Sequence, residues 1–228
     1  KVPENAWCLH VLRSPFASAY IKSINTSEAE KLPGVAAILT AYNTPETHYM
    51  QAGQGNPEPS PHDRRLFNRK VRHVGDRVAG IIAHTPEIAD QAAALIKVEY
   101  EPQGAVYTVE EAMAEGAPLV HNGEVIYNAG APADLEGKVV YQFPLGADIH
   151  KNIAASNKGG IGDMEKGFAE ADAIVERTYQ TSQIQHTPLE PHVCYAHIEG
   201  GRLVLNCATQ VPYHVRRIVS WVCGIPEN

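Results

Sequence analysis

The sequence predicts a mixed α/β fold, and three patterns support this. A continuous apolar run at residues 78–83 is followed by apolar residues at helical spacing over 88–96 and by a further strand pattern at 97–101. Residues 193–208 form a pattern of two strands joined by a Gly-Gly turn, and an amphipathic helix pattern follows from Pro212. Strands that alternate with helices in this way are typical of α/β domains.

Length and charge limit the function classes. The chain has 228 residues, which suffice for one large domain or two ordinary ones. Its 26 acidic residues outnumber its 19 basic residues and give a formal net charge of −7. Nucleic acids and anionic membranes attract clustered Lys and Arg, which this chain lacks. No apolar run approaches the roughly 20 residues of a membrane span. We therefore expect no nucleic acid and no membrane as partners, and no signal peptide.

The cysteines favour a reducing compartment. The four thiols are too far apart for a Cys-x-x-Cys pair and too few for a disulfide scaffold: Cys8, Cys194, Cys207 and Cys223. We expect reduced cysteines in a cytoplasmic-type protein. The chain begins Lys1-Val2-Pro3 without a methionine, and we expect it to be a piece of something longer.

The first segments predict strands at residues 7–12, 19–25 and 35–40. Ser27 and Glu30 stand at the spacing of a capping box, which predicts a short helix before Pro33-Gly34. Residues 41–69 are rich in Pro, Gly, Asn and His without a sustained period. They predict a long loop, and loops of that length are usually functional or insertions.

After this segment, the next regular pattern is the apolar run at 78–83, which predicts a strand covered on both faces. Thr85 and Pro86 predict the start of a helix, whose buried face is expected at Ile88, Ala89, Ala92, Ala93 and Ile96. A strand at 97–101 and a capping box of Thr108 with Glu111 follow. We predict that residues 1–115 form one α/β domain.

Residues 116–162 are rich in glycine and turn pairs, and we predict a connector. A second domain, 163–228, is expected to begin with a helix capped by Asp163. Strands are predicted at 173–181, 193–198 and 203–208, the last two joined by Gly200-Gly201. A final helix is predicted between Pro212 and Gly224.

Two polar clusters stand at the corners of this second domain: Gln185, His186 and Glu190, and Thr209 with Gln210. Polar groups at strand ends and helix starts are where enzymes commonly hold ligands. A metal site of His186, Glu190 and His192 remains an alternative, but without a strict ligand spacing a hydrogen-bonded corner is favoured. The glycines at 159–162 could bind phosphate at a helix start, although the Asp163 carboxylate would occupy that place.

Four pieces of sequence together resemble the large subunit of the molybdenum hydroxylases, the xanthine dehydrogenase and aldehyde oxidase family. In chain order they are Arg13-Ser14-Pro15 with Leu32-Pro33-Gly34-Val35; Val71 to Ala79 with the alanine-rich helix after it; Gly162-Asp163 through Phe168 to Ala171-Asp172; and Gln185-His186 with Leu189-Glu190, followed by Thr209-Gln210-Val211-Pro212. The resemblance implies an α/β hammerhead-like domain followed by the beginning of a molybdopterin-binding α+β domain.

What the resemblance implies about function is an oxidoreductase. The chain would be the N-terminal portion of a catalytic subunit that oxidises a heterocycle or aldehyde with water-derived oxygen at a molybdenum–molybdopterin cofactor. Gln185, His186, Glu190, Thr209 and Gln210 would lie near that cofactor, with no catalytic residue and no direct metal ligand among them. Iron–sulfur clusters and FAD would belong to partner subunits or segments. The other partners would be the remainder of its own chain and a small-molecule substrate.

One departure from the family concerns Ile184, which stands where many members carry a glutamine close to the metal. The family's glycine-rich loop and catalytic glutamate are also expected beyond Asn228, so we expect the chain to be inactive by itself. The alternative function is a non-catalytic assembly module of the same architecture, with residues 41–69 as its contact surface.

Overall fold

The computed structural model describes residues 3–49, 61–121, 127–128, 148, 151–154, 156 and 159–227. The chain divides into two compact units, one of residues 1–156 and 210–228 and the other of residues 157–209. Most of the predicted connector at 116–162 lies outside the described residues, as does part of the predicted loop at 41–69.

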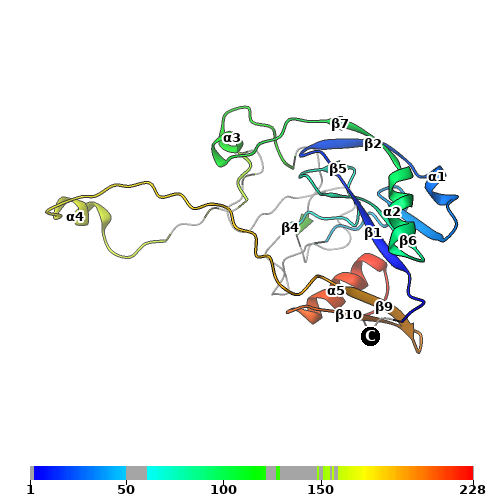
Figure 1. Cartoon of the computed structure of the whole chain (residues 1–228). Coiled ribbons are helices and arrows are strands. Elements are labelled where there is room, and N and C mark those ends of the chain that lie inside the picture. Colours follow the sequence, from blue (N-terminus) through cyan, green and yellow to red (C-terminus); the bar gives the residue numbers. More distant parts are fainter. Residues whose placement is uncertain are drawn as a thin grey trace. The chain divides into compact units, whose positions relative to one another are not determined.

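The first unit contains two three-stranded sheets (Figure 1). Their orders are β1 (Cys8–Arg13), β6 (Arg77–Ala83), β3 (Val35–Thr40), and β5 (Lys70–Val71), β2 (Ala19–Asn25), β7 (Lys97–Pro102). All four strand pairs within these sheets are antiparallel. A further antiparallel pair joins β4 (Pro61–His62) to β8 (Tyr127–Asn128). The strands predicted near 7–12, 19–25, 35–40, 78–83 and 97–101 are thereby confirmed.

Strand β6 is the centre of the core. Ala79, Ile81 and Ala83 project to one face and are fully buried against helix α2 (Pro86–Leu95). Val78 projects to the other face, where it packs in a second buried cluster with Val71. Both neighbours of β6 run antiparallel, so its continuous apolar character comes from burial on both faces and not from a parallel sheet.

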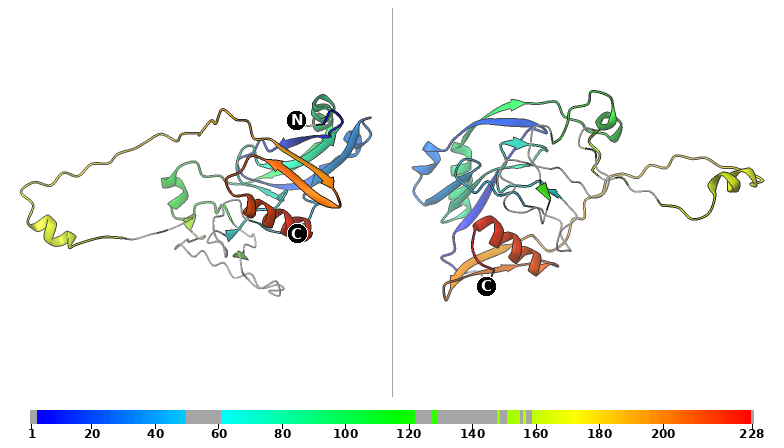
Figure 2. Two further views of the ribbon diagram at one scale, coloured as in Figure 1. Left: turned by 90° about the horizontal axis from the view of Figure 1, so that it is seen from below. Right: turned by 180° about the vertical axis from the view of Figure 1, so that it is seen from behind.

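Helix α2 connects the two sheets. It begins as predicted, because the Thr85 hydroxyl accepts a hydrogen bond from the Ile88 amide at 3.3 Å and Pro86 occupies the first turn. Ala89, Ala92 and Ala93 are buried, which confirms the predicted apolar face. Figure 2 shows α2 beside the strands from two further sides. The strand–helix–strand unit of β6, α2 and β7 therefore links different sheets.

The two capping boxes differ in outcome. At helix α3 (Val109–Met113), the Glu111 amide donates to the Thr108 hydroxyl at 3.1 Å and the Thr108 amide donates to the Glu111 carboxylate at 3.3 Å, as predicted. At helix α1 (Ser27–Glu30), the predicted box is wrong because the helix starts one residue earlier. Thr26 is the N-cap there, and its hydroxyl donates to the Glu30 carboxylate at 2.6 Å.

The second unit contains helix α4 (Met164–Ala169) and the hairpin of β9 (Cys194–Glu199) and β10 (Arg202–Cys207). Asp163 caps α4 by accepting a hydrogen bond from the Lys166 amide at 3.0 Å. The hairpin turns at Gly200 and Gly201, whose φ angles of 56° and 78° fit a two-residue turn with both centres left-handed. Both features were predicted.

The strand predicted at 173–181 is wrong. This segment runs without regular secondary structure, and it pairs with no strand in the part of the chain that is described. A strand pattern records alternation of side chains, but a strand forms only when another strand supplies hydrogen-bond partners. Residues 173–181 have the side-chain alternation of a strand, but among the described residues no other strand pairs with them.

Helix α5 (Pro212–Cys223) belongs to the first unit. Pro212 begins it, and Gly224 ends it at φ 64° and ψ 32°, a left-handed conformation that glycine adopts without a Cβ clash. Val222 is buried, whereas Val215, Ile218 and Val219 are half-buried. The predicted apolar stripe is therefore present and only partly covered.

Candidate cofactor-binding site

The predicted corner at residues 185–190 is an exposed segment of the second unit without regular secondary structure. Gln185, His186 and Glu190 are all exposed, and the His186 amide donates to the Gln185 side-chain oxygen at 3.1 Å. Thr187 has a φ of 42°, which is left-handed. A β-branched residue seldom adopts that conformation, and it costs about 1–3 kcal/mol unless other contacts hold it. A strained residue inside a polar corner is typical of a functional site.

Thr209 and Gln210 follow strand β10 and lead into helix α5. Both side chains are exposed. Val211 stands at the N-cap of α5, and its apolar side chain offers no acceptor to the amides of the first turn. Helix α5 therefore begins without a side-chain cap hydrogen bond.

The five predicted site residues together offer several hydrogen-bond donors and acceptors. Gln185 and Gln210 offer amide donors and acceptors, Thr209 a hydroxyl, and His186 an imidazole. Glu190, when ionised, only accepts, so it pairs with ring N–H or amino groups. Among the residues described, no group of three or more His, Cys, Asp or Glu side chains could hold a metal ion.

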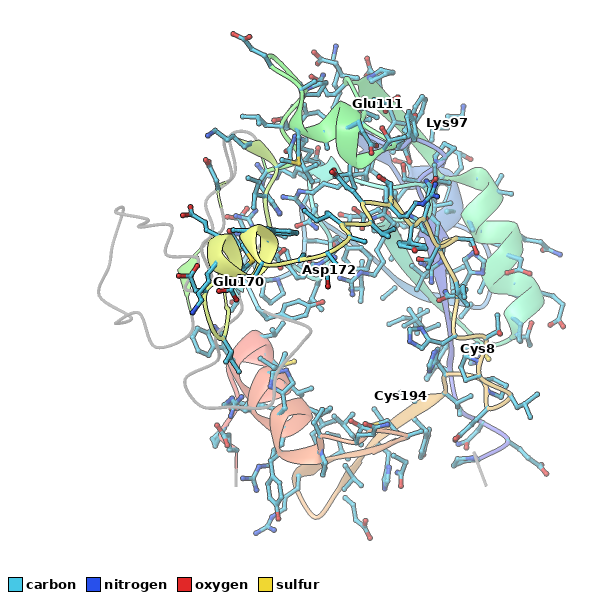
Figure 3. All side chains as sticks on the ribbon, turned by 90° about the vertical axis from the view of Figure 1, so that its left-hand side faces the viewer. Cys8, Lys97, Glu111, Glu170, Asp172 and Cys194 are labelled. Carbon is cyan, nitrogen blue, oxygen red and sulfur yellow. The ribbon has the colours of Figure 1, made fainter. Side chains whose placement is uncertain are left out.

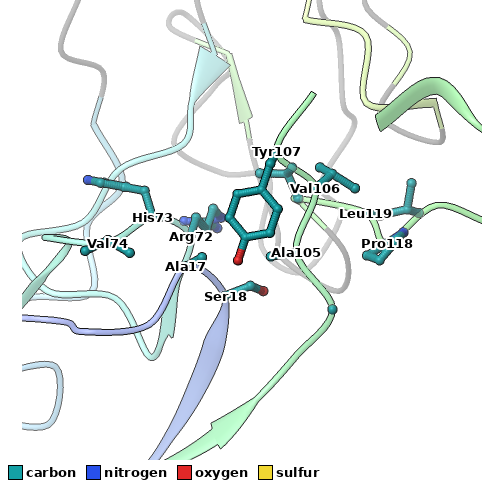
Figure 4. A pocket seen from close by; sticks show the side chains of 12 residues that line it. Ala17, Ser18, Arg72, His73, Val74, Ala105, Val106, Tyr107, Pro118 and Leu119 are labelled. Carbon is teal, nitrogen blue, oxygen red and sulfur yellow. The ribbon is translucent and has the colours of Figure 1, made fainter. Parts of the chain in front are cut away.

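A pocket of about 280 Å³ lies elsewhere, in the first unit (Figure 4). Its wall comes from the start of β2, the turn after β5, and residues 104–107 and 118–120; Arg72, His73, Tyr107 and Leu119 are among the lining side chains. None of the five predicted site residues lines it. Sequence reasoning missed this pocket because its wall is assembled from four distant segments, and the sequence does not show that these segments meet.

Beside this pocket lies a group of basic side chains. The Lys70 ammonium is buried and donates to the carbonyls of Leu119 and Val120 at 3.3 and 3.1 Å. The Nε2 atom of His121 lies 3.9 Å from an Asp63 carboxylate oxygen. Burial lowers the pKa of His121, and the nearby Arg72 charge lowers it further, against an opposing effect of Asp63. His121 is therefore held neutral at pH values where an exposed histidine takes up a proton.

No helix among the described residues is long and apolar enough to cross a membrane.

Comparison with known families covers most of the chain. Residues 1–104 match the family model of the aldehyde oxidase and xanthine dehydrogenase a/b hammerhead domain, and residues 145–228 match the molybdopterin cofactor-binding domain. The second match includes all five predicted site residues.

Two proteins of related sequence match the chain over nearly all of its length. The chain is 48% identical to the probable hypoxanthine oxidase of Escherichia coli strain K12 over 100% of its own length and 25% of that protein. It is 32% identical to the xanthine dehydrogenase molybdenum-binding subunit of Escherichia coli O157:H7, over 94% of this chain and 26% of that protein. The chain thus spans about a quarter of the length of these relatives.

Solved structures show the same fold. The aldehyde oxidoreductase of Desulfovibrio gigas superposes with a TM-score of 0.71 at 21% identity, over 99% of this chain and 23% of that one. The quinoline 2-oxidoreductase of Pseudomonas putida 86 superposes with a TM-score of 0.70 at 28% identity, over 96% of this chain and 25% of that one. The predicted fold class is confirmed, and the chain belongs to the xanthine dehydrogenase and aldehyde oxidase family of molybdenum hydroxylases.

Proposed function

We propose that the protein to which this chain belongs is a xanthine dehydrogenase-like hydroxylase that oxidises a purine such as hypoxanthine with water-derived oxygen. The observation that carries the proposal is the 48% identity to a probable hypoxanthine oxidase along the whole chain, with the cofactor-binding match at residues 145–228. We further propose residues 1–115 as the hammerhead domain, 116–162 as a connector and 163–228 as the start of the cofactor-binding domain. Iron–sulfur and FAD groups on partner subunits or domains, and a cytoplasmic location, complete the proposal.

The five polar residues would hold the cofactor. When the cofactor is bound, the molybdenum that the pterin holds would supply the two-electron redox centre. Gln185 and Gln210 would orient it through their amides, Thr209 and His186 would donate to its oxygens or ring nitrogens, and Glu190 would accept from its amino groups. Ile184 offers only an apolar side chain at the position where many family members place a glutamine. Contact near the metal from this corner would therefore come from the neighbouring Gln185.

The second unit needs more protein around it. Every described residue from 159 to 194 is exposed, and the segment includes Ile161 at 104% and Leu189 at 102% relative exposure. Tyr179 and Ile184 are 87% and 84% exposed. Burying one such side chain contributes about 1.5–3 kcal/mol, so covering these four contributes roughly 6–12 kcal/mol. The remainder of the protein would supply that cover, and the 228-residue chain alone would not turn over substrate.

The test uses the full-length protein, matured with its partners. Metal analysis and fluorescence of released pterin should show molybdenum and pterin in equal amounts, and hypoxanthine should be oxidised faster than an aldehyde. If neither molybdenum nor pterin is present, the enzyme proposal is lost, and the non-catalytic assembly module becomes the better function. If both are present but an aldehyde is the better substrate, only the purine assignment fails.

A matched pair of variants tests the site. Gln185→Ala and Gln183→Ala remove the same side chain from the same exposed segment, but only Gln185 is proposed to face the cofactor. Loss of one hydrogen bond to a bound group costs about 1–3 kcal/mol. At limiting cofactor we expect the pterin content of Gln185→Ala to fall several-fold, with Gln183→Ala at the wild-type level. Equal effects of the two variants would contradict the assignment of this corner.

A further inference from the structure

Two thiols stand directly opposite each other on the β9–β10 hairpin. Cys194 is the first residue of β9 and Cys207 the last residue of β10, and the strand register pairs them. Figure 3 labels Cys194 at the start of its strand. Neither residue takes part in the proposed function. We propose that Cys194 and Cys207 form a dithiol site that hydrogen peroxide oxidises to an intramolecular, cross-strand disulfide.

The hydrogen-bonding pattern of β9 and β10 brings Cys194 and Cys207 close enough for a disulfide bond. The turn at Gly200-Gly201 joins Glu199 to Arg202, which as the ends of a two-residue turn form a hydrogen-bonded pair. Hydrogen-bonded and non-hydrogen-bonded pairs then alternate, so the Cys194/Cys207 pair, the sixth in the register, is non-hydrogen-bonded. The Cα atoms of such a pair are about 4.5 Å apart. Disulfides span Cα separations of roughly 4.4–6.8 Å, so the bond can form without movement of the strands.

The side chains are already in contact. The Cys207 thiol hydrogen-bonds to the Cys194 thiol, which requires that both sulfur atoms point to the same face of the hairpin. Both cysteines are reduced in the structure. Cys194 is exposed and Cys207 half-buried, so a small oxidant reaches the pair.

Burial first, and then the neighbouring Cys207, raises the pKa of Cys194. The thiolate is the reactive form, so at neutral pH little of it is present and oxidation is slow. Its rate rises with pH until the thiol is ionised. The pair is therefore stable as a dithiol in a reducing compartment and responds to sustained oxidant.

The chemistry balances with peroxide as the oxidant. The Cys194 thiolate attacks one peroxide oxygen, the O–O bond breaks, and a sulfenic acid and hydroxide result; hydroxide takes a proton to become water. The Cys207 sulfur then attacks the sulfenic sulfur, the S–O bond breaks, and a second water leaves with the Cys207 proton. Two thiols and one peroxide thus give one disulfide and two water molecules.

Trypsin makes the test direct, because Arg202 lies in the turn between the two cysteines. Cleavage after Arg177, Arg202 and Arg216 releases Cys194 in peptide 178–202 and Cys207 in peptide 203–216. The full-length protein is treated with hydrogen peroxide, quenched with acid, denatured, alkylated near neutral pH and digested without reductant. We expect one linked species, lighter by two hydrogen atoms than the sum of the two peptides, which reductant separates.

The control variants keep the number of thiols constant. Leu205→Cys with Cys207→Ser moves one thiol two residues along the same face, to a diagonal separation of about 7–8 Å that exceeds the usual disulfide span. This variant should give at least ten-fold less linked peptide. Cys8→Ser with Cys223→Ser should link as the wild type does. The proposal is overturned if peroxide leaves both peptides separate, if either cysteine links to Cys8 or Cys223 instead, or if the diagonal variant links equally well.

Discussion

Replacing Ile81 by alanine tests the core of the first unit. Ile81 lies on the central strand β6 and is fully buried. Ile→Ala substitutions in protein cores cost about 2–5 kcal/mol, the higher values where neighbours cannot close the cavity. Six of the nine buried residues of its cluster are alanines, whose side chains have no rotamers with which to fill the space. We therefore expect a loss of about 4 kcal/mol for Ile81→Ala and about 1 kcal/mol for Ile81→Val.

Urea unfolding of the chain, followed by tryptophan fluorescence, measures these losses. Trp7 stacks on His84 with ring centroids 3.9 Å apart, so its emission reports the end of β6. A Trp221→Phe background removes the second tryptophan. With a slope of about 2 kcal/mol per molar urea, the midpoint should fall by about 2 M for Ile81→Ala and about 0.5 M for Ile81→Val.

Leu9→Ala is the matched control, since Leu9 lies on the adjacent strand β1 but is 64% exposed. It should cost about 0.5 kcal/mol or less. If Leu9→Ala lowers the urea midpoint as much as Ile81→Ala does, Ile81 is not the central core residue that its burial indicates. Should Ile81→Ala not fold at all, the comparison of Ile81→Val with Leu9→Ala decides the question.

Three further predictions concern a cap, two glycines and a titrating group. Asp163→Ala removes the acceptor of the Lys166 amide and should cost helix α4 about 0.5–2 kcal/mol, seen as faster amide hydrogen exchange over residues 164–169. Gly34→Ala should destabilise more than Gly75→Ala in thermal unfolding: both have φ near 90°, but only at Gly34 would the new Cβ meet a side chain, at 2.8 Å. The pKa of His121 is lower in the folded protein than in the unfolded chain. As the pH falls below 6.5, the unfolded chain therefore binds more protons than the folded protein does, and the free energy of unfolding should decrease. His121→Asn should reduce that fall between pH 7.5 and 5.5, and an unchanged pH dependence would contradict the assignment.

Features that depend on neighbouring residues were predictable from the sequence. The caps at Thr85, Thr108 and Asp163 match their hydrogen bonds in the structure. The Gly200-Gly201 turn and the helix end at Gly224 are equally local, because a left-handed φ is a property of one residue. The error at Ser27 is of one residue: Thr26 and Ser27 are both good N-cap residues, and the capping-box spacing of Ser27 with Glu30 favours the wrong one.

The candidate site was predictable only as a set of residues. The polar corner and the Thr209-Gln210 pair were singled out from their residue types at strand ends, but the left-handed conformation of Thr187 inside the corner was not predicted. The contact of the Cys194 and Cys207 thiols was also missed, although the predicted Gly200-Gly201 turn already sets the strand register that pairs them.

The order of the local elements and the family follow from the residue pattern along the chain. Each element is specified by side-chain period and by caps that act within a few residues. The tertiary structure alone decided that β6 and β7 join different antiparallel sheets, that four distant segments enclose a pocket, and that residues 173–181 form no strand. The physical reason is the same in each case: strand pairing and burial depend on partners far along the chain, and the pattern of a segment does not say which partner it meets.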